Sequence, residues 1–224
     1  MGCFDLLKEQ LNTLCPQLDV RMGEPLERHT SFHIGGPAAL MAFPATQEEA
    51  VLCVRTASKL GITPFFMGNG SNLLAADRGV NRFLIKTSNL RGCKAEGNVI
   101  TADSGITLAR LAVFARGQGL TGLEFAHGIP GTLGGAVTMN AGAYGGEMAQ
   151  VVRQVTVLTK TGEVETLDNF DFGYRRSAFS DGRRMILGAR LELAAGNREQ
   201  IAGRMGKVLR AAFGQLLRRA EAPH

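Results

Sequence analysis

The chain has 224 residues, of which 45% are hydrophobic and 20% are charged, a balance typical of a globular protein with one domain or two small ones. Its formal net charge of +5 is spread along the chain without a nucleic-acid recognition motif, so we expect an anionic small-molecule partner and no nucleic acid. The sequence has no secretory signal and no apolar run of bilayer-spanning length, so we expect a cytoplasmic protein with no membrane partner.

The first ninety residues carry the pattern of a strand, a helix and a strand. The predicted elements are a helix over 4–14, a strand over 38–43, a helix over 47–60, and strands over 64–67 and 83–85. Thr46 and Glu49 have the spacing of a capping box at the start of the second helix, and Gly61 is placed to end it. The strand over 64–67 leads directly into a glycine-rich segment.

The remainder of the chain mixes strands and helices in the same way. The predicted elements are a strand over 99–102, a helix over 108–115 ended by Gly117, a hairpin of 151–158 with 164–167, a buried strand over 185–193, and a final amphipathic helix over 201–216. On that last helix Arg204, Lys207 and Arg218 are expected to face outward. We therefore predict an α+β fold with subdomains 1–90 and 91–196 sharing one cleft, followed by a C-terminal helix and tail over 197–224.

A first glycine-rich segment, Gly68-Asn69-Gly70-Ser71-Asn72, follows a predicted strand directly. Glycines let the main chain approach a ligand closely, so such a segment offers amide donors to a phosphate. It is neither a Rossmann fingerprint, because Leu73 occupies the position of the third glycine, nor a P-loop, because no Gly-Lys-Ser/Thr triplet is present. A tight turn without a ligand remains an alternative for so short a stretch.

A second and longer segment runs from Gly128 to Gly135 and continues through Asn140-Ala141-Gly142. Ordering so many glycines costs much backbone entropy, which favours a ligand role over a purely structural one. The intervening apolar residues, Ile129 among them, fit either packing against a flat heterocycle or a place in the core. The two segments together predict a phosphate-bearing cofactor.

A third motif, Phe172 to Ser177, places a phenol, two guanidinium groups and a hydroxyl together. It fits either a surface turn with ion pairs or an anion site, since guanidinium groups bind carboxylate or phosphate bidentately. His127 is consistent with a ligand contact or a turn cap. His29 and His33 lack the Glu of a metalloprotease helix and the four cysteines lack metal-ligand spacing, so we expect no metal site.

These motifs, in this order, resemble the bacterial UDP-N-acetylenolpyruvoylglucosamine reductases, which make the muramic acid precursor of peptidoglycan. The resemblance extends from about Leu26 to Arg219 and includes Ile34 to Ala38, the two glycine segments and Phe172 to Arg175. It implies an FAD-binding fold of the PCMH type, also called vanillyl-alcohol-oxidase-like, in which two α+β subdomains hold the flavin between them. It also implies NADPH as reductant and the enolpyruvyl double bond of a sugar nucleotide as hydride acceptor.

The resemblance assigns roles to residues of this chain. Arg175 matches the catalytic arginine of the family, and Tyr174 is expected beside it in the substrate-binding site. The residues implied to contact FAD are Gly68, Asn69, Gly70, Ser71 and Asn72 at the pyrophosphate, with Gly128, Ile129, Pro130, Gly131, Thr132, Gly134, Gly135, Asn140, Ala141 and Gly142 along the rest of the flavin.

The family continues into a third, substrate-binding domain with a proton-donating Ser and a late Glu, for which we find no counterpart before His224. We therefore expect either a reductase or an FAD-binding remnant or regulatory flavoprotein without full turnover. Another oxidase or dehydrogenase of the same flavin fold is a third alternative, which the lack of a convincing His or Cys for covalent flavin attachment disfavours. The sequence does not specify an oligomeric state.

Overall fold

The first part of the chain folds into a four-stranded sheet with two helices against it. The computed structural model describes residues 2–220, and their side chains except those of Phe213 and 215–220. The elements of this part are α1 Cys3–Leu14, β1 Val20–Pro25, the 3-10 turn η1 Leu26–Arg28, β2 Pro37–Ala42, α2 Gln47–Lys59, β3 Phe65–Met67, β4 Val80–Lys86 and η2 Thr87–Asn89. The sheet order is β1-β2-β4-β3, with β4 parallel to both β2 and β3.

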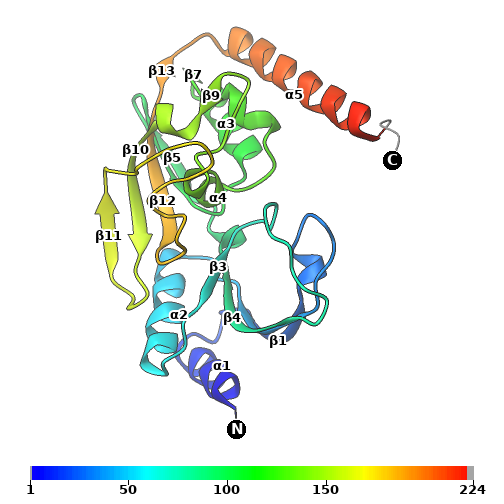
Figure 1. Cartoon of the computed structure of the whole chain (residues 1–224). Helices are drawn as coiled ribbons and strands as arrows, with labels where there is room; N and C mark the ends of the chain where they lie inside the picture. Colours follow the sequence, from blue (N-terminus) through cyan, green and yellow to red (C-terminus); the bar gives the residue numbers. More distant parts are fainter. Residues whose placement is uncertain (1, 221–224) are drawn as a thin grey trace.

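The second part is built on a five-stranded antiparallel sheet in the order β11-β10-β12-β6-β5. Its elements are β5 Cys93–Glu96, β6 Val99–Asp103, α3 Leu108–Gly117, β7 Leu120–Thr121, η3 Glu124–Gly128, α4 Leu133–Thr138, β8 Gly142–Ala143, β9 Gly146–Glu147, η4 Met148–Gln150, β10 Val152–Leu158, β11 Val164–Leu167, β12 Met185–Glu192, β13 Ala194–Ala195 and α5 Arg198–Ala220. Figure 1 shows the two sheets one above the other, with α5 leading away from the second. Among residues 2–220, no helix combines the length and apolarity that a membrane crossing requires.

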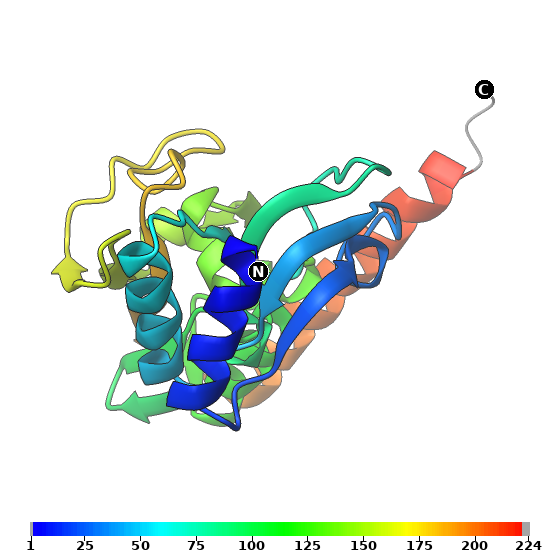
Figure 2. The ribbon, with the colours of Figure 1, turned by 90° about the horizontal axis from the view of Figure 1, so that it is seen from below.

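The first sheet is covered on both faces. Figure 2 shows α1 and α2 side by side along it. Leu40 and Phe83 belong to the core that these helices close. On the opposite face Met41 and Leu84 pack with Met67 in a smaller cluster. Consecutive residues of β2 and β4 therefore face alternate cores, as the two-residue period of a strand requires.

The two parts share buried surface. Leu158 of β10 and Met185 and Leu187 of β12 belong to the core of the first sheet, although their strands belong to the second sheet. The sheets lie on either side of residue 90, and the division into subdomains 1–90, 91–196 and 197–224 stays a prediction, because the packing crosses its first boundary.

Each of the predicted helices and strands is present, but six strands and the short helix α4 were missed. Four of these strands, β7, β8, β9 and β13, have only two residues each, too few to show a period. β1 and β5 lie at sheet edges and carry mostly half-exposed or exposed side chains, so neither shows the apolar alternation that reveals a strand. The Thr46 side chain caps α2 by accepting from the Glu49 amide (3.2 Å). Glu49 does not complete a capping box, since it accepts from the Ala45 amide instead. The side chains of Leu216 and Arg218 and the tail from residue 221 lie outside the described residues.

We predict that Leu187→Ala lowers the free energy of unfolding by about 2–5 kcal/mol, because it leaves a cavity where the two parts meet. Urea unfolding of the chain followed by circular dichroism measures this. Val164→Ala on the exposed strand β11 is the control and is expected to change stability by less than about 0.5 kcal/mol. Equal effects of the two substitutions would contradict the shared core.

Candidate functional site

The first glycine segment forms a loop that β3 delivers directly, since Gly68 follows Met67 at the end of the strand. The loop lies against residues 29–31, where the Ser31 amide donates to the Gly70 carbonyl (3.3 Å). The main-chain N–H groups of Asn69, Gly70, Ser71 and Asn72 donate no hydrogen bond to any described residue. The loop therefore presents free amide donors, as an anion-binding segment requires.

The turn between η3 and α4 meets this loop. The Ser71 hydroxyl donates to the Pro130 carbonyl (3.4 Å), and Gly131 adopts a φ of +137°, which a side chain rarely tolerates. A Cβ atom on Gly68 would lie 2.5 Å from the Thr132 Oγ1 atom. The two glycine segments are thus in direct contact, and the absence of a side chain at Gly68 allows it.

Thr132 carries an unsatisfied polar group at this contact. Its side chain is 2% exposed, and Oγ1 has no hydrogen-bond partner among the described residues. A buried hydroxyl without a partner is costly, and a ligand oxygen would satisfy it. The free amides, the orphaned hydroxyl and the side-chain-free approach fit a diphosphate group, which accepts hydrogen bonds only.

Other residues predicted for this site lie elsewhere. Gly128 packs against Val208 of α5, and Gly134 lies in α4 against Ser104 with its amide donating to the Ser104 carbonyl (2.8 Å). Gly142 lies in the small β8–β9 hairpin beside Glu147. Ile129 and Ala141 pack on the core of the second sheet. The long glycine run is therefore not one continuous surface, and contact of these five residues with a cofactor stays a prediction.

Arg175 joins the first glycine segment from a tight turn. The amides of Gly173 and Arg176 each donate to the other residue's carbonyl, which places Tyr174 and Arg175 at the tip. Arg175 has a φ of +53°, a strained value for a residue other than glycine. Its Nη2 atom donates to Oδ1 of Asn72 (3.3 Å), so the third motif lies at the end of the loop. Tyr174 is 93% exposed beside it.

Asn140 holds this turn in place. Its side chain is buried, and Nδ2 donates to the Gly173 carbonyl and to Oε2 of Glu147 (3.2 Å each). Its Oδ1 accepts from the Ala149 amide (2.9 Å). The described hydrogen bonds of Asn140 connect the second glycine segment to the Arg175 turn. Contact of Asn140 with the cofactor stays a prediction.

Ser177 of the third motif and His29 have structural contacts. The Ser177 hydroxyl donates to the Thr138 carbonyl (2.8 Å) at the end of α4, so this hydrogen bond holds the third motif against that helix.

His29 pairs with Glu24 (2.8 Å), and no group of metal-ligating side chains occurs among residues 2–220. Burial alone would raise the pKa of Glu24, but hydrogen bonds from His29 and Arg21 outweigh it and lower that pKa. The Nδ1 atom of His127 is buried without a described partner.

One charged residue near the first loop escaped the sequence analysis. Lys86 ends β4 and is 8% exposed, and burial lowers its pKa to about 8. Its Nζ donates to the carbonyls of Gly68 (3.3 Å) and His29 (3.4 Å). A single lysine after an apolar strand is typical of a solvated strand end, so only the fold reveals that it is buried.

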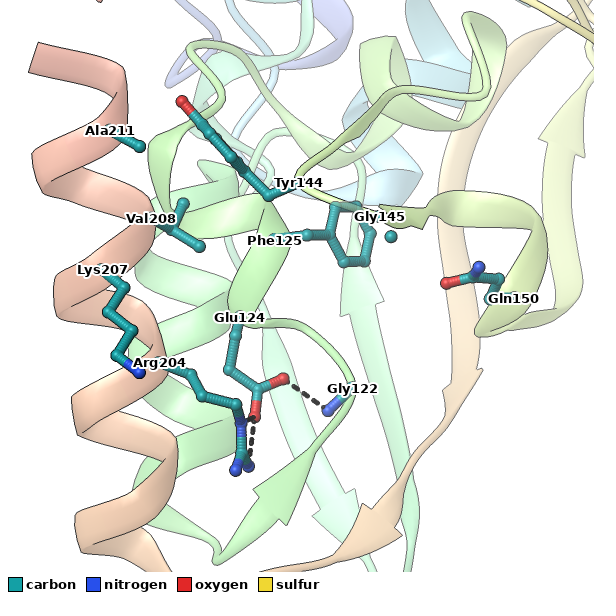
Figure 3. Close-up of a pocket in the computed structure, with 11 residues that line it drawn as sticks. Gly122, Glu124, Phe125, Tyr144, Gly145, Gln150, Arg204, Lys207, Val208 and Ala211 are labelled. Carbon is teal, nitrogen blue, oxygen red and sulfur yellow. Dashed lines mark hydrogen bonds and ion pairs between the residues drawn. The ribbon is translucent and has the colours of Figure 1, made fainter. Parts of the chain in front are cut away.

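A pocket of about 480 Å³ lies elsewhere, under α5 (Figure 3). Arg204 of α5 pairs with Glu124 of η3 (2.8 Å), which in turn accepts from the Gly122 amide (2.8 Å). Burial alone would raise the pKa of Glu124, but hydrogen bonds from Thr121, Gly122 and Arg204 hold it below its usual value. Lys207 and Tyr144 line the same pocket. None of its lining residues is among those predicted to hold the cofactor.

Comparisons with known proteins agree on one family. The family described as "FAD binding domain" matches residues 38–168. The chain is 42% identical over 210 residues to a UDP-N-acetylenolpyruvoylglucosamine reductase of Streptococcus thermophilus, covering 93% of this chain and 68% of that protein. A reductase of the same name from Caldanaerobacter subterraneus is 40% identical, with 90% of this chain and 67% of that protein covered.

Solved structures agree in fold. A UDP-N-acetylenolpyruvylglucosamine reductase from Thermus caldophilus superposes with a TM-score of 0.74 at 33% identity, over 88% of this chain and 70% of that chain. An alkyldihydroxyacetonephosphate synthase superposes with a TM-score of 0.62 at 19% identity, over 86% of this chain and 44% of that chain. The α+β fold of the FAD-binding PCMH type is thereby confirmed.

We predict that Asn140→Gly, which keeps the positive φ of 41° available, costs about 1–3 kcal/mol of stability and releases the Arg175 turn. The Gly173 carbonyl loses one of its two donors and the Ala149 amide loses its acceptor, so amide hydrogens over 171–176 should exchange faster. Hydrogen exchange with mass spectrometry measures this. Asn98→Gly in the exposed β5–β6 turn is the control. Unchanged exchange over 171–176 would show that Asn140 does not hold the turn.

Proposed function

Because this chain belongs to the UDP-N-acetylenolpyruvoylglucosamine reductase family, we propose that it is an FAD-containing oxidoreductase of peptidoglycan precursor synthesis in the cytoplasm. The reaction is the NADPH-dependent reduction of UDP-N-acetylglucosamine enolpyruvate to UDP-N-acetylmuramate. The observation that carries the proposal is the meeting of three segments, the loop Gly68–Asn72, the turn at Gly131 and the turn at Arg175, at one place.

The loop and turn supply what the FAD diphosphate needs. The free amides of Asn69 to Asn72 and the unpartnered hydroxyl of Thr132 are donors at the contact between the two glycine segments. Phosphate oxygens are acceptors only, and a positively polarised main-chain concavity favours their charge. Bound FAD supplies the hydride transfer of this reaction. The chain's own contribution is to position the cofactor and to present charged groups to the substrate.

Arg175 is the proposed catalytic residue of this chain. Its guanidinium is exposed at the tip of the turn and is oriented by the amide oxygen of Asn72. A positioned guanidinium binds a carboxylate and stabilises negative charge that develops on a neighbouring enolate. The exposed Tyr174 adjoins it and is proposed to contact the substrate. Since Asn72 also belongs to the cofactor loop, one side chain links the cofactor site to the substrate site.

The visible spectrum of the purified chain tests the proposal. We expect bound FAD, bleaching by NADPH, and reoxidation in the absence of oxygen when the enolpyruvyl sugar nucleotide is added. A chain that binds FAD but responds to neither reagent would instead support the non-catalytic flavoprotein. A folded chain that binds no FAD would contradict both.

We predict that Arg175→Ala slows substrate-linked reoxidation by about 100- to 1,000-fold, as loss of a transition-state charge partner does, while FAD affinity changes less than about threefold. Stopped-flow absorbance and fluorescence titration measure the two quantities. Arg176→Ala, next in the chain and also exposed, is the matched control for general loss of positive charge. If Arg175→Ala abolishes FAD binding instead, Arg175 is a cofactor residue and not a catalytic one.

A further inference from the structure

Lys86 is a buried cation that the proposed reaction does not use. Its Nζ donates to two main-chain carbonyls, and no carboxylate of a described residue forms an ion pair with it. A buried ammonium without a counter-ion is unfavourable, and such groups are rare unless a charge of opposite sign is bound nearby. The described part of the chain supplies no such charge.

The two carbonyls that accept from Lys86 both lie at the first glycine loop. One is the carbonyl of Gly68, the first residue of the loop. The other is the carbonyl of His29, which lies so close to Gly70 that a Cβ there would overlap it. The ammonium therefore lies against the backbone at the start of the loop, and the amides of Asn69 to Asn72 in that loop have no described acceptor.

We propose that Lys86 is the counter-charge of the diphosphate held by the Gly68–Asn72 loop, a positioning and affinity residue for FAD. This inference rests on the proposed function. The main-chain amides make the hydrogen bonds, and the ammonium behind them compensates the negative charge. Because it contacts both the Gly68 carbonyl and the His29 carbonyl, it also ties the start of the loop to the neighbouring segment 29–31.

This arrangement couples FAD binding to pH. In the free chain burial lowers the pKa of Lys86 to about 8, and an adjacent anion favours the charged form and raises that pKa. Affinity is therefore highest below pH 8, where Lys86 is already charged, and falls as the pH rises above 8, where binding must recruit a proton. The chain thus takes up protons on binding near pH 8.

Other ionisable groups near Lys86 are few. Residues 65–72, the strand β2 and the turn η2 carry none, and β4 itself carries Arg82. The segment that includes His29 contributes the imidazole, whose Nε2 atom pairs with Glu24, and Glu24 is shared with Arg21 (3.1 Å). These groups stay in place when Lys86 is replaced, so substitution of Lys86 isolates its own contribution.

The test is a calorimetric titration of the full chain with FAD at pH 7, 8 and 9, with Lys86→Met as the variant. The wild-type chain should bind most tightly at pH 7 and lose up to about tenfold in affinity for each pH unit above 8. Lys86→Met should bind FAD about 10- to 100-fold more weakly at pH 7, because it loses the attraction of one unit charge at an effective dielectric constant near 20. Its affinity for FAD should not fall above pH 8, because it lacks the group that loses a proton there.

Proton uptake gives a second measurement that does not depend on comparing affinities. At pH 8 the binding enthalpy of the wild-type chain should differ between HEPES and Tris by the heat of a fractional proton, whereas that of Lys86→Met should not. Lys94→Met, at an exposed lysine of β5, is the matched control and should behave as the wild type. Urea unfolding without FAD checks that Lys86→Met folds, as a methionine replacing an unpaired buried charge should.

The outcomes separate the two proposals. If the wild-type chain binds FAD without proton uptake, or Lys86→Met binds as tightly as the wild type, the role of Lys86 is overturned while the proposed function stands. If the folded wild-type chain binds no FAD at any pH, both are overturned.

Discussion

The site depends on the contact between Gly68 and Thr132. Two segments more than sixty residues apart in the sequence approach so closely there that a single added carbon would lie 2.5 Å from a hydroxyl oxygen. One segment comes from the end of the parallel strand β3 and the other from the turn before α4. The contact brings the first loop, with its free amides, against the residue that carries the unpartnered Thr132 hydroxyl, so the donors gathered here come from main chain and not from long side chains.

Asparagine side chains connect this contact to the turn that carries Arg175. Asn72 accepts from Arg175, and Asn140 donates to the carbonyl of Gly173, so both glycine segments are tied to the same turn. Asn140 and Arg175 both adopt positive φ values, which cost energy and persist only where neighbouring contacts impose them. Contacts with Asn72 and Asn140 hold the strained turn from two sides. The turn therefore fixes the Arg175 guanidinium next to the proposed cofactor, although Arg175 lies in no helix or strand.

Much of this architecture could be predicted from the sequence, because its signals are local. The β3 strand and the loop after it follow from Phe65 to Gly70, and the cap of α2 follows from Thr46. Contacts between distant segments left no such signal. Arg175 and Asn72 are 103 residues apart, and nothing in either motif indicates that they meet. The continuity of the second glycine run in the sequence likewise gave no sign that Gly128 packs against α5, Gly134 against Ser104 and Gly131 against Ser71.

The most direct test of diphosphate binding at the Gly68–Asn72 loop is the amide spectrum of the ¹⁵N-labelled chain during titration with FAD. We expect the N–H signals of Asn69 to Asn72 to shift most, together with those of Gly131 and Thr132, because these groups acquire phosphate acceptors. Signals of Glu124 and Lys207, in the pocket under α5, should stay unchanged. Large shifts around that pocket, with none in the Gly68–Asn72 loop, would contradict the account.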